Sequence, residues 1–488
     1  VFGKNPFVFH LFGVLMHAIT AALVTRLYQA LSLRAWALWA GAAFAVHPLL
    51  SEAVCGIGFC EDILAALFVV ASILCVLHHS NNPSSFVALP FSMILFVFAL
   101  FSKESAIALI PIVVFLGWLA PLFCLNRQRI LVCLALLVLL ALFYLWVRFV
   151  VMPGTAVPAV PLDRNPAVVL ATSARILLSY LGRLIWPANI SVNYLMHPVS
   201  AATWIFLMSV AAHLLLIAIA LVFRRRLPLF LLGVFWFYSA VAPVSNIVPI
   251  FNPEADRYLY LPAIGCFLAV GSLLEHVHVK SLIVARLVSI AAISLVLGWA
   301  GQSVIREGDW RDNHTLWSKE LSLNPGNARA MAELAVENNH KGKHIEAEKL
   351  CRDALSIDGN LALARLQLSK SLLMQRRYDE ALSSYQSLLQ KGGLHPHHLS
   401  QAWFDTAYIL DQVMKKQDEA IKAYSNVIAI DPYYLGASLN LARIYADRGD
   451  FQSAAGVLRE AMKKSPGNAG LQECLNGVES RWQENTRK

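Results

Sequence analysis

Charged residues are scarce in this chain: Asp, Glu, Lys and Arg make up 15% of its 488 residues, whereas soluble domains usually carry about 25%. Hydrophobic residues reach 57%, and the mean hydropathy is +0.56. The eight cysteines include no Cys-x-x-Cys pair and no Cys/His cluster with zinc spacing, which argues against a disulfide framework and a metal site. Cys55 and Cys60 lie close together in the sequence and could pair in an oxidising lumen. These features exclude an ordinary soluble protein.

The shortage of charge is confined to the first part of the chain. Residues 1–305 hold 16 Lys and Arg and 8 Asp and Glu, whereas residues 306–488 hold 24 and 23. The net charge of +9 therefore comes almost entirely from the apolar part, which excludes a basic tail that binds nucleic acid. We expect an all-α protein: a multi-span transmembrane domain over 1–305, with a long lumenal loop at 152–202, followed by a water-soluble domain over 306–488.

Ten apolar runs are candidates for membrane-spanning helices, which need about 20 residues each: 7–31, 35–50, 62–79, 86–102, 105–123, 130–151, 203–223, 229–250, 257–275 and 282–304. If all ten cross the bilayer, the basic clusters between them fall on one side, which the positive-inside rule makes cytoplasmic. These clusters are Arg26 with Arg34, Arg127 with Arg129, Arg224 to Arg226, and Lys280 with Arg286. Residues 306–488 then lie in the lumen, as do the two glycosylation sequons at Asn189 and Asn313.

Acidic residues of the membrane domain gather on the predicted lumenal side. Seven of the eight lie at lumenal span ends or in lumenal loops: Glu52, Glu61, Asp62, Glu104, Asp163, Glu254 and Asp256. Carboxylates at membrane depth are expensive and usually mark a site. Ordinary polar loops are the alternative explanation for each residue alone. For the whole set, convergence on one face predicts a polar site at that surface.

An amphipathic stretch occupies part of the long loop, from Arg175 to Trp186. Its apolar positions recur at helical spacing, while Arg175 and Arg183 face elsewhere. We expect a helix in the plane of the membrane interface, anchored by Tyr180 and Trp186, where a lipid-linked substrate can dock. A loop helix that merely seals the bundle explains the pattern equally well.

Residues 306–488 contain an internal repeat. Ala347, Ala381, Ala420 and Ala454 each follow a polar turn and open an apolar-periodic helix, at spacings of 34, 39 and 34 residues. This period, with a small residue at the packing face and Pro at repeat boundaries, is typical of tetratricopeptide (TPR) repeats. We assign the five extra residues to an inter-repeat loop near 391–396. Its histidines, His395, His397 and His398, have no accompanying thiol or carboxylate, which favours a solvated loop over a metal site.

Several motifs occur in a fixed order along the chain, and in this order they resemble the TMTC-type family of endoplasmic-reticulum membrane proteins with lumenal TPR repeats. The motifs are Phe9-His10-Leu11 with His17, His47-Pro48 through Glu52-Ala53-Val54, Gly58 through Ala65, Lys103-Glu104, Asp163 to Pro166, and Asp256-Arg257-Tyr258-Leu259-Tyr260-Leu261-Pro262. The resemblance covers nearly all 488 residues.

The resemblance implies a GT-C fold enzyme of the endoplasmic reticulum membrane. It would transfer mannose from dolichyl-phosphate mannose, a lipid-linked substrate, to Ser or Thr of secretory-pathway proteins such as cadherin domains. We expect no cofactor, and no ligand cluster in the sequence demands a metal. The TPR array would bind the acceptor or another partner. We expect Arg257 and Lys103, with Arg164 as a third candidate, to contact the donor phosphate. Sugar or acceptor would be positioned by carboxylates, for which the candidates are Glu52, Asp62, Glu104 and Asp256.

Two departures from the family pattern affect these expectations. Relatives carry the expected catalytic base in a lumenal loop between their first two spans, and we expect that loop to lie upstream of Val1, so the base is unassigned and these residues alone should be inactive. Relatives also often have Gly-Arg-Ala-Asp where this chain has Gly58-Phe59-Cys60-Glu61-Asp62.

Two other functions are alternatives to the mannosyltransferase. One is a non-catalytic lumenal TPR adaptor anchored in the membrane. The other is a transporter or a transferase with another sugar donor.

Overall fold

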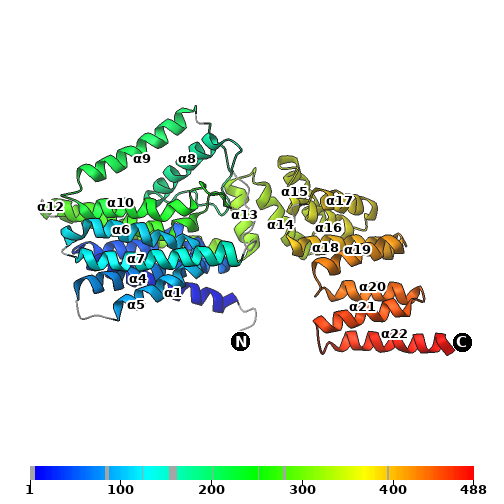
Figure 1. Ribbon diagram of the computed structural model, residues 1–488. Helices are drawn as coiled ribbons and strands as arrows, with labels where there is room; N and C mark the ends of the chain where they lie inside the picture. The colour runs from blue at the N-terminus through cyan, green and yellow to red at the C-terminus, as the bar shows by residue number, and fades with distance from the viewer. Residues whose placement is uncertain are drawn as a thin grey trace. The chain divides into compact units, whose positions relative to one another are not determined.

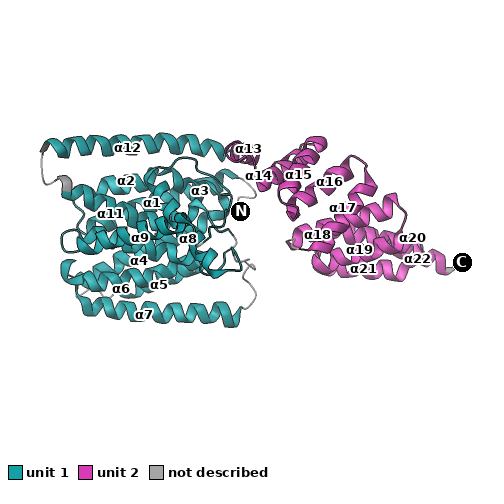
Figure 2. Ribbon diagram, turned by 90° about the horizontal axis from the view of Figure 1, so that it is seen from above, with its two compact units in different colours: residues 1–311 teal, residues 312–488 magenta. Residues whose placement is uncertain are grey.

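The computed structural model describes residues 6–82, 87–123, 125–152, 162–200, 202–250, 252–278, 282–392 and 395–487, and it is all-α, with no strand in these residues. The chain forms two compact units, residues 1–311 and 312–488 (Figure 2). The sequence-based boundary after residue 305 falls inside the last turn of helix α12 (Leu282–Asp309). Cys55 and Cys60 are both free thiols, and Lys280 lies outside the described residues.

The described residues of unit 1 form twelve α-helices and several short 3₁₀ and π turns. The α-helices are α1 (Pro6–Ala30), α2 (Ala37–Val46), α3 (Ser51–Cys55), α4 (Cys60–Asn81), α5 (Ala88–Ser102), α6 (Leu109–Leu119), α7 (Arg127–Trp146), α8 (Pro166–Ile185), α9 (Trp204–Val222), α10 (Pro228–Val241), α11 (Tyr260–His278) and α12. The turns include η1 (Pro48–Leu50), η3 (Glu104–Ala108), η5 (Val147–Val151) and η7 (Asp256–Leu259). Figure 2 shows α7 and α12 on opposite sides of the unit, and both expose many apolar side chains. Such exposed apolar faces suit a lipid environment.

Each of the ten predicted spans contains helix, but they do not form ten full-length helices. Eight helical segments in the described residues are long and apolar enough to cross a membrane. The run at 35–50 is a bent pair, Ala37–Val46 with Pro48–Cys55, at 47°. The runs at 86–102 and 229–250 form the shorter apolar helices Ala88–Ser102 and Pro228–Val244. Conversely α8, placed in the predicted loop, is itself one of the eight, because amphipathicity alone does not exclude a spanning length.

Helices α10 and α11 cross at two glycines. A Cβ built on Gly233 would lie 2.4 Å from the Gly265 carbonyl oxygen, and one built on Gly265 would lie 2.6 Å from the Gly233 carbonyl oxygen. Small residues at such a crossing allow helix backbones to approach closely in membranes. The glycine pair therefore sets the distance between α10 and α11, and α11 follows directly on the η7 turn.

Replacing Gly265 by valine is expected to destabilise unit 1 by about 1–3 kcal/mol, because the added atoms meet backbone that cannot move without separating the helices. Thermal unfolding of the detergent-purified protein measures the effect. Gly301→Val is the matched control, since a Cβ on Gly301 in α12 meets nothing within 4 Å. Equal destabilisation by both variants would contradict the crossing argument and indicate a helix-propensity effect alone.

Unit 2 is a stack of antiparallel helix pairs, seen edge-on for α20–α22 in Figure 1. Its helices are α13 (Asn313–Leu323), α14 (Ala328–His340), α15 (His344–Ile357), α16 (Ala362–Met374), α17 (Tyr378–Lys391), α18 (Pro396–Tyr408), α19 (Gln417–Ile430), α20 (Leu435–Asp447), α21 (Phe451–Lys464) and α22 (Ala469–Arg487), with a π-helical turn, η8 (Ile409–Val413). The second helix of each pair begins three residues before one of the predicted alanines. Those alanines, Ala347, Ala381, Ala420 and Ala454, are all fully buried.

The extra five residues of the long repeat do not lie in a loop, so that prediction is wrong. The first residues of α17 and α18, Tyr378 and Pro396, stand as far apart as those of α15 and α16 or of α19 and α20. The added length instead falls between Pro396 and the start of α19 at Gln417, where α18 continues into η8. The insertion therefore lengthens a helix and leaves the connection between repeats unchanged. The spacing of the repeats gives the number of inserted residues, but it does not show where in the repeat they lie.

Tyr385 in α17 links two repeats. Its ring is fully buried, and its hydroxyl donates to Asp405 Oδ2 of α18 at 2.7 Å. Burial raises the pKa of Asp405, while the hydrogen bond from Tyr385 opposes that shift. Because the pKa of this carboxyl is higher in the folded protein than in the unfolded chain, its charge reduces stability above that pKa, and the penalty disappears as the pH falls.

Tyr385→Phe is expected to destabilise unit 2 by about 1–3 kcal/mol near neutral pH, since it leaves the Asp405 carboxylate without this donor. The loss should shrink toward about pH 4, near the pKa of an unfolded Asp, where the carboxyl is protonated. Urea unfolding of residues 312–488, which have their own hydrophobic cores, measures both values. Tyr433→Phe, at a side chain 65% exposed, should change neither; a loss for Tyr385→Phe that is independent of pH would refute the electrostatic part.

Candidate functional site

Glu52 and Arg257 form a buried ion pair between segments far apart in sequence. Glu52, in α3, is 2% exposed. One carboxylate oxygen accepts from the Arg257 guanidinium at 2.5 Å, and the other accepts from the Arg257 backbone N–H at 3.0 Å. The short η7 turn presents both donors of Arg257 to one carboxylate. The bend between α2 and α3 therefore brings the motif that contains Glu52 onto the motif that contains Arg257.

Lys103 and Asp62 form a second pair beside the first. The Lys103 ammonium lies 2.5 Å from Asp62 Oδ2 and 3.9 Å from Glu61 Oε1. Lys103 follows the last residue of α5, and Asp62 lies in the first turn of α4. The Tyr258 ring joins the two pairs, since Lys103 Nζ is 5.4 Å and Arg257 Cζ 5.0 Å from its centroid. Five predicted residues thus meet here: Glu52, Asp62, Lys103 and the neighbours Asp256 and Arg257.

A third network extends from Asp256 to helix α8. Arg183 of α8 donates to Glu254 Oε1 at 2.5 Å and lies 3.3 Å from Asp256 Oδ1. The Tyr194 hydroxyl donates to Asp256 at 2.8 Å. Burial, with the nearby Asp256 carboxylate, raises the pKa of Tyr194, so it stays a phenol that can donate. Arg175, two turns before Arg183, approaches Glu254 Oε2 at 3.5 Å.

The structure corrects the expectation for α8. Tyr180 is not an interfacial anchor, because it is fully buried and its hydroxyl accepts from the Ala255 backbone N–H at 3.1 Å. Trp186, just after the helix, is exposed. The two arginines are the site residues that sequence analysis did not select. Their spacing of two helical turns places them on one face of the helix. Their acidic partner Glu254 lies 71 residues beyond Arg183, so nothing in the sequence near α8 indicates the pairing.

Two predicted residues lie outside these networks. The Glu104 side chain is 60% exposed and pairs at 3.1 Å with Arg148 of η5. Arg164 is exposed on the turn before α8 and makes none of the ion pairs described above. Both sequon asparagines, Asn189 and Asn313, are exposed; the Asn313 amide donates to Glu337 at 3.2 Å.

The chemistry of the cluster follows from its alternating charges. Each cation has a carboxylate partner, which offsets the cost of removing both from water. Lys103 and Arg257 keep side-chain exposures of 15% and 13%, so an incoming anion can reach them, whereas Glu52 and Asp62 lie deeper. In the described residues no group of three His, Cys, Asp or Glu side chains is arranged to hold a metal ion. The cluster therefore presents two paired cations near the surface and keeps their carboxylate partners buried.

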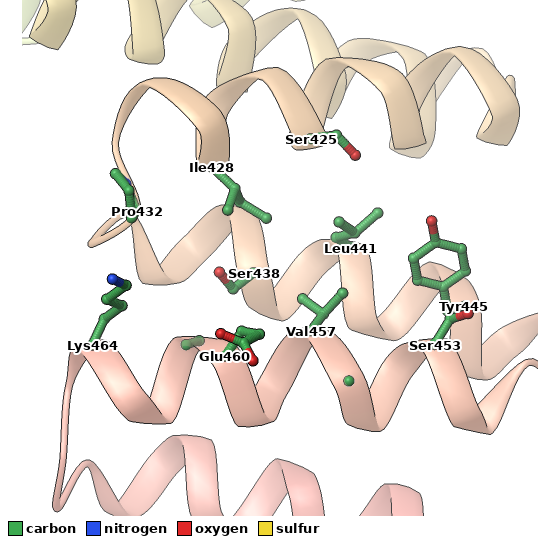
Figure 3. Close-up of a pocket in the computed structure, with 12 residues that line it drawn as sticks. Ser425, Ile428, Pro432, Ser438, Leu441, Tyr445, Ser453, Val457, Glu460 and Lys464 are labelled. Carbon is green, nitrogen blue, oxygen red and sulfur yellow. The ribbon is translucent and has the colours of Figure 1, made fainter.

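Unit 2 contains a separate groove of about 610 Å³ between α19 and α21, with α20 as its floor (Figure 3). Leu441 and Tyr445 rise from α20, and Ile428 and Val457 face each other across the opening (Figure 3). The groove is apolar at its centre and has Glu460 and Lys464 at one end. Such a hollow suits apolar side chains of a peptide.

A tetratricopeptide repeat family model matches residues 414–472. The mouse protein O-mannosyl-transferase TMTC3 is 22% identical over 96% of this chain and 56% of its own length. The Caenorhabditis elegans protein O-mannosyl-transferase F38B6.6 is 25% identical over 72% of this chain and 50% of its own length. The solved structure of MamA is 20% identical, with a TM-score of 0.30, over 35% of this chain and 96% of MamA.

The chain thus spans about half the length of these curated relatives. The two O-mannosyl-transferase matches extend over the membrane unit as well as the repeats, whereas the family model covers repeats alone. These matches identify the curated homologues of this chain as TMTC-type protein O-mannosyl-transferases, which confirms the resemblance drawn from its sequence motifs.

Proposed function

We propose that the protein to which this chain belongs transfers mannose from dolichyl-phosphate mannose to Ser or Thr hydroxyls of secretory or membrane proteins. The observation that carries the proposal is the pair of ion pairs, Glu52–Arg257 and Asp62–Lys103, gathered around Tyr258 at the ends of apolar helices. A lipid-linked sugar phosphate presents an anion at the membrane surface, and two partly exposed cations within one cluster suit that anion.

In this reaction the acceptor oxygen bonds to the anomeric carbon of mannose, and the bond from that carbon to the phosphate oxygen breaks. Arg257 and Lys103 would stabilise the charge that develops on the departing dolichyl phosphate. Glu52 and Asp62 would hold the two cations in place while phosphate is absent. The proton of the acceptor hydroxyl goes to a general base, which we expect in the lumenal loop that relatives carry between their first two spans.

The test uses the full-length protein in liposomes with radiolabelled dolichyl-phosphate mannose and a Ser/Thr-rich acceptor domain. We expect label on the acceptor, with none from dolichyl-phosphate glucose or from GDP-mannose without a dolichyl carrier. Transfer from one of these other donors would overturn the donor assignment. Absence of transfer, with acceptor binding retained by residues 312–488 alone, would instead favour the membrane-anchored TPR adaptor.

The proposal includes a GT-C-like membrane domain in the endoplasmic reticulum, with the TPR unit in the lumen, where its groove can bind acceptor or partner proteins. The exposed sequon residue Asn313 allows a direct test of this orientation. Asn313→Gln is expected to remove one endoglycosidase-H-sensitive glycan, visible as a mobility shift in cell extracts. Asn476→Gln, at an exposed asparagine of α22 without a sequon, is the control. An unglycosylated Asn313 with a glycosylated Asn189 would place the two sites on different sides.

A further inference from the structure

A crevice of about 290 Å³ lies between α12 and the segment that follows α8. Its walls include Trp186 on one side and Leu295, Gly298, Trp299 and Gln302 of α12 on the other. None of these residues belongs to the ion-pair cluster, so the crevice is a separate feature of unit 1.

The walls are fixed by packing and hydrogen bonding. Trp299 is buried against the His47 ring, at 4.6 Å between centroids, and against Phe267 at 6.0 Å. The Gln302 amide donates to the Pro187 carbonyl oxygen at 2.5 Å, which ties the segment after α8 to α12. Packing holds the wall at Trp299, and the hydrogen bond of Gln302 holds the wall formed by the segment after α8. The crevice is therefore preformed, as ligand sites usually are.

Gly298 leaves the crevice open. A Cβ added to Gly298 meets nothing within 4 Å, so no side chain of this protein fills the crevice beside Gly298. On the neighbouring turns of α12, Ile290, Ile293 and Leu297 are exposed. Segment Ile283–Asp309 is apolar and long enough to cross a bilayer. The crevice therefore continues an exposed apolar helix face, where hydrocarbon rather than water is the surrounding solvent.

The dimensions and the aromatic walls favour a single hydrocarbon chain from one leaflet. Ser294 and Gln302 delimit the crevice along α12, a rise of about 12 Å. One leaflet of the hydrocarbon core is about 15 Å deep. Trp side chains are enriched at the boundary between that core and the headgroups, and here Trp186, 72% exposed, stands at the outer wall. A straight acyl chain fits such a short apolar groove.

We propose that the crevice between Trp186 and Gly298 binds one acyl chain of a resident membrane phospholipid. The bound chain fills the space left by Gly298 and packs between the two tryptophan rings, so a bilayer lipid becomes part of the contact between α12 and the segment after α8. This site is independent of mannose transfer, and its occupant differs from the lipid-linked donor.

The experiment places the whole chain in phosphatidylcholine nanodiscs that contain a phosphatidylcholine with a photoreactive diazirine on one acyl chain. After illumination, labelling is mapped by mass spectrometry to the peptides around 186–188 and 294–302. Gly298→Phe fills the crevice and is expected to lower labelling there about tenfold. The acyl chain would lose the burial of roughly two methylenes in the variant, and that loss lowers the occupancy of the crevice by about this factor. Gly301→Phe is the matched control, at an exposed glycine one turn further on whose added Cβ also meets nothing.

The outcomes separate specific binding from random lipid contact. Labelling in the wild type that falls with Gly298→Phe but persists with Gly301→Phe supports the site. No labelling in the wild type, or equal loss in both variants, overturns it. Preferential labelling by a diazirine polyprenyl phosphate, with competition against the phosphatidylcholine probe, overturns the assignment of the occupant. If Gly298→Phe lowers the thermal stability of the protein, Trp186→Ala replaces it: loss of the outer wall should also lower labelling without filling any space.

Discussion

Replacing Arg257 by alanine is expected to lower mannose transfer by the full-length protein by at least about 100-fold, the loss typical when a donor to a developing charge is removed. The guanidinium is one of two partly exposed cations beside Tyr258. Its removal takes away the proposed phosphate contact. It also leaves Glu52, 2% exposed, as a buried carboxylate without its cation. The measurement is initial-rate transfer of radiolabelled mannose in liposomes, at equal amounts of folded protein.

Two further variants separate a lost phosphate contact from a damaged fold. The double variant Glu52→Gln with Arg257→Ala removes the unpaired charge, so it should regain stability relative to Arg257→Ala while transfer stays low. Arg225→Ala, at an exposed arginine in the turn after α9, is the control and should transfer normally. If the double variant recovers both stability and transfer, Arg257 acts only by neutralising Glu52. In that case the phosphate-binding role would have to pass to Lys103.

The sequence placed the members of this ion-pair cluster on one surface, but it did not indicate their contacts. Glu52, Asp62, Lys103, Asp256 and Arg257 each stand at the end of an apolar run, and alternation of the runs puts such ends on one surface. That Glu52 pairs with a residue 205 positions away depends on the bend between α2 and α3, which hydropathy does not reveal. The apolar runs that form short helices show the same limit. Hydrophobicity indicates where an apolar run lies, but not where the helix within it ends.

Helix α8 shows why an amphipathic pattern is ambiguous. The pattern correctly indicates two faces, but it assigns no neighbour to either of them. With the membrane interface as the assumed neighbour, Tyr180 became an anchor; in the structure that position is fully buried by packing within unit 1. The shared face of the two arginines could be predicted in the same way, but their carboxylate partners could not: Glu254 lies just before η7, and Asp256 is its first residue. Tertiary partners decide which residues of such a helix are functional.

The second large effect is expected at Arg183, where the structure shows a role that the sequence did not. Arg183→Met keeps a long apolar side chain but removes the cation that contacts both Glu254 and Asp256. Breaking a buried pair by removing one partner typically costs about 3–5 kcal/mol. Because Tyr194 and Arg175 still approach the two carboxylates, we expect the packing of α8 against η7 to loosen rather than unit 1 to unfold completely.

Hydrogen exchange of the detergent-purified chain measures this change, as a loss of protection in residues 166–185 while α10 and α11 stay protected. Arg175→Met is the matched control on the same helix face, and its longer 3.5 Å contact and partial exposure predict a clearly smaller loss. Comparable loss in the two variants would mean that the α8 face acts as a whole and that Arg183 has no special part. If Arg183→Met instead leaves protection intact and lowers only transfer, the residue contacts substrate, and the donor site extends from Tyr258 along α8.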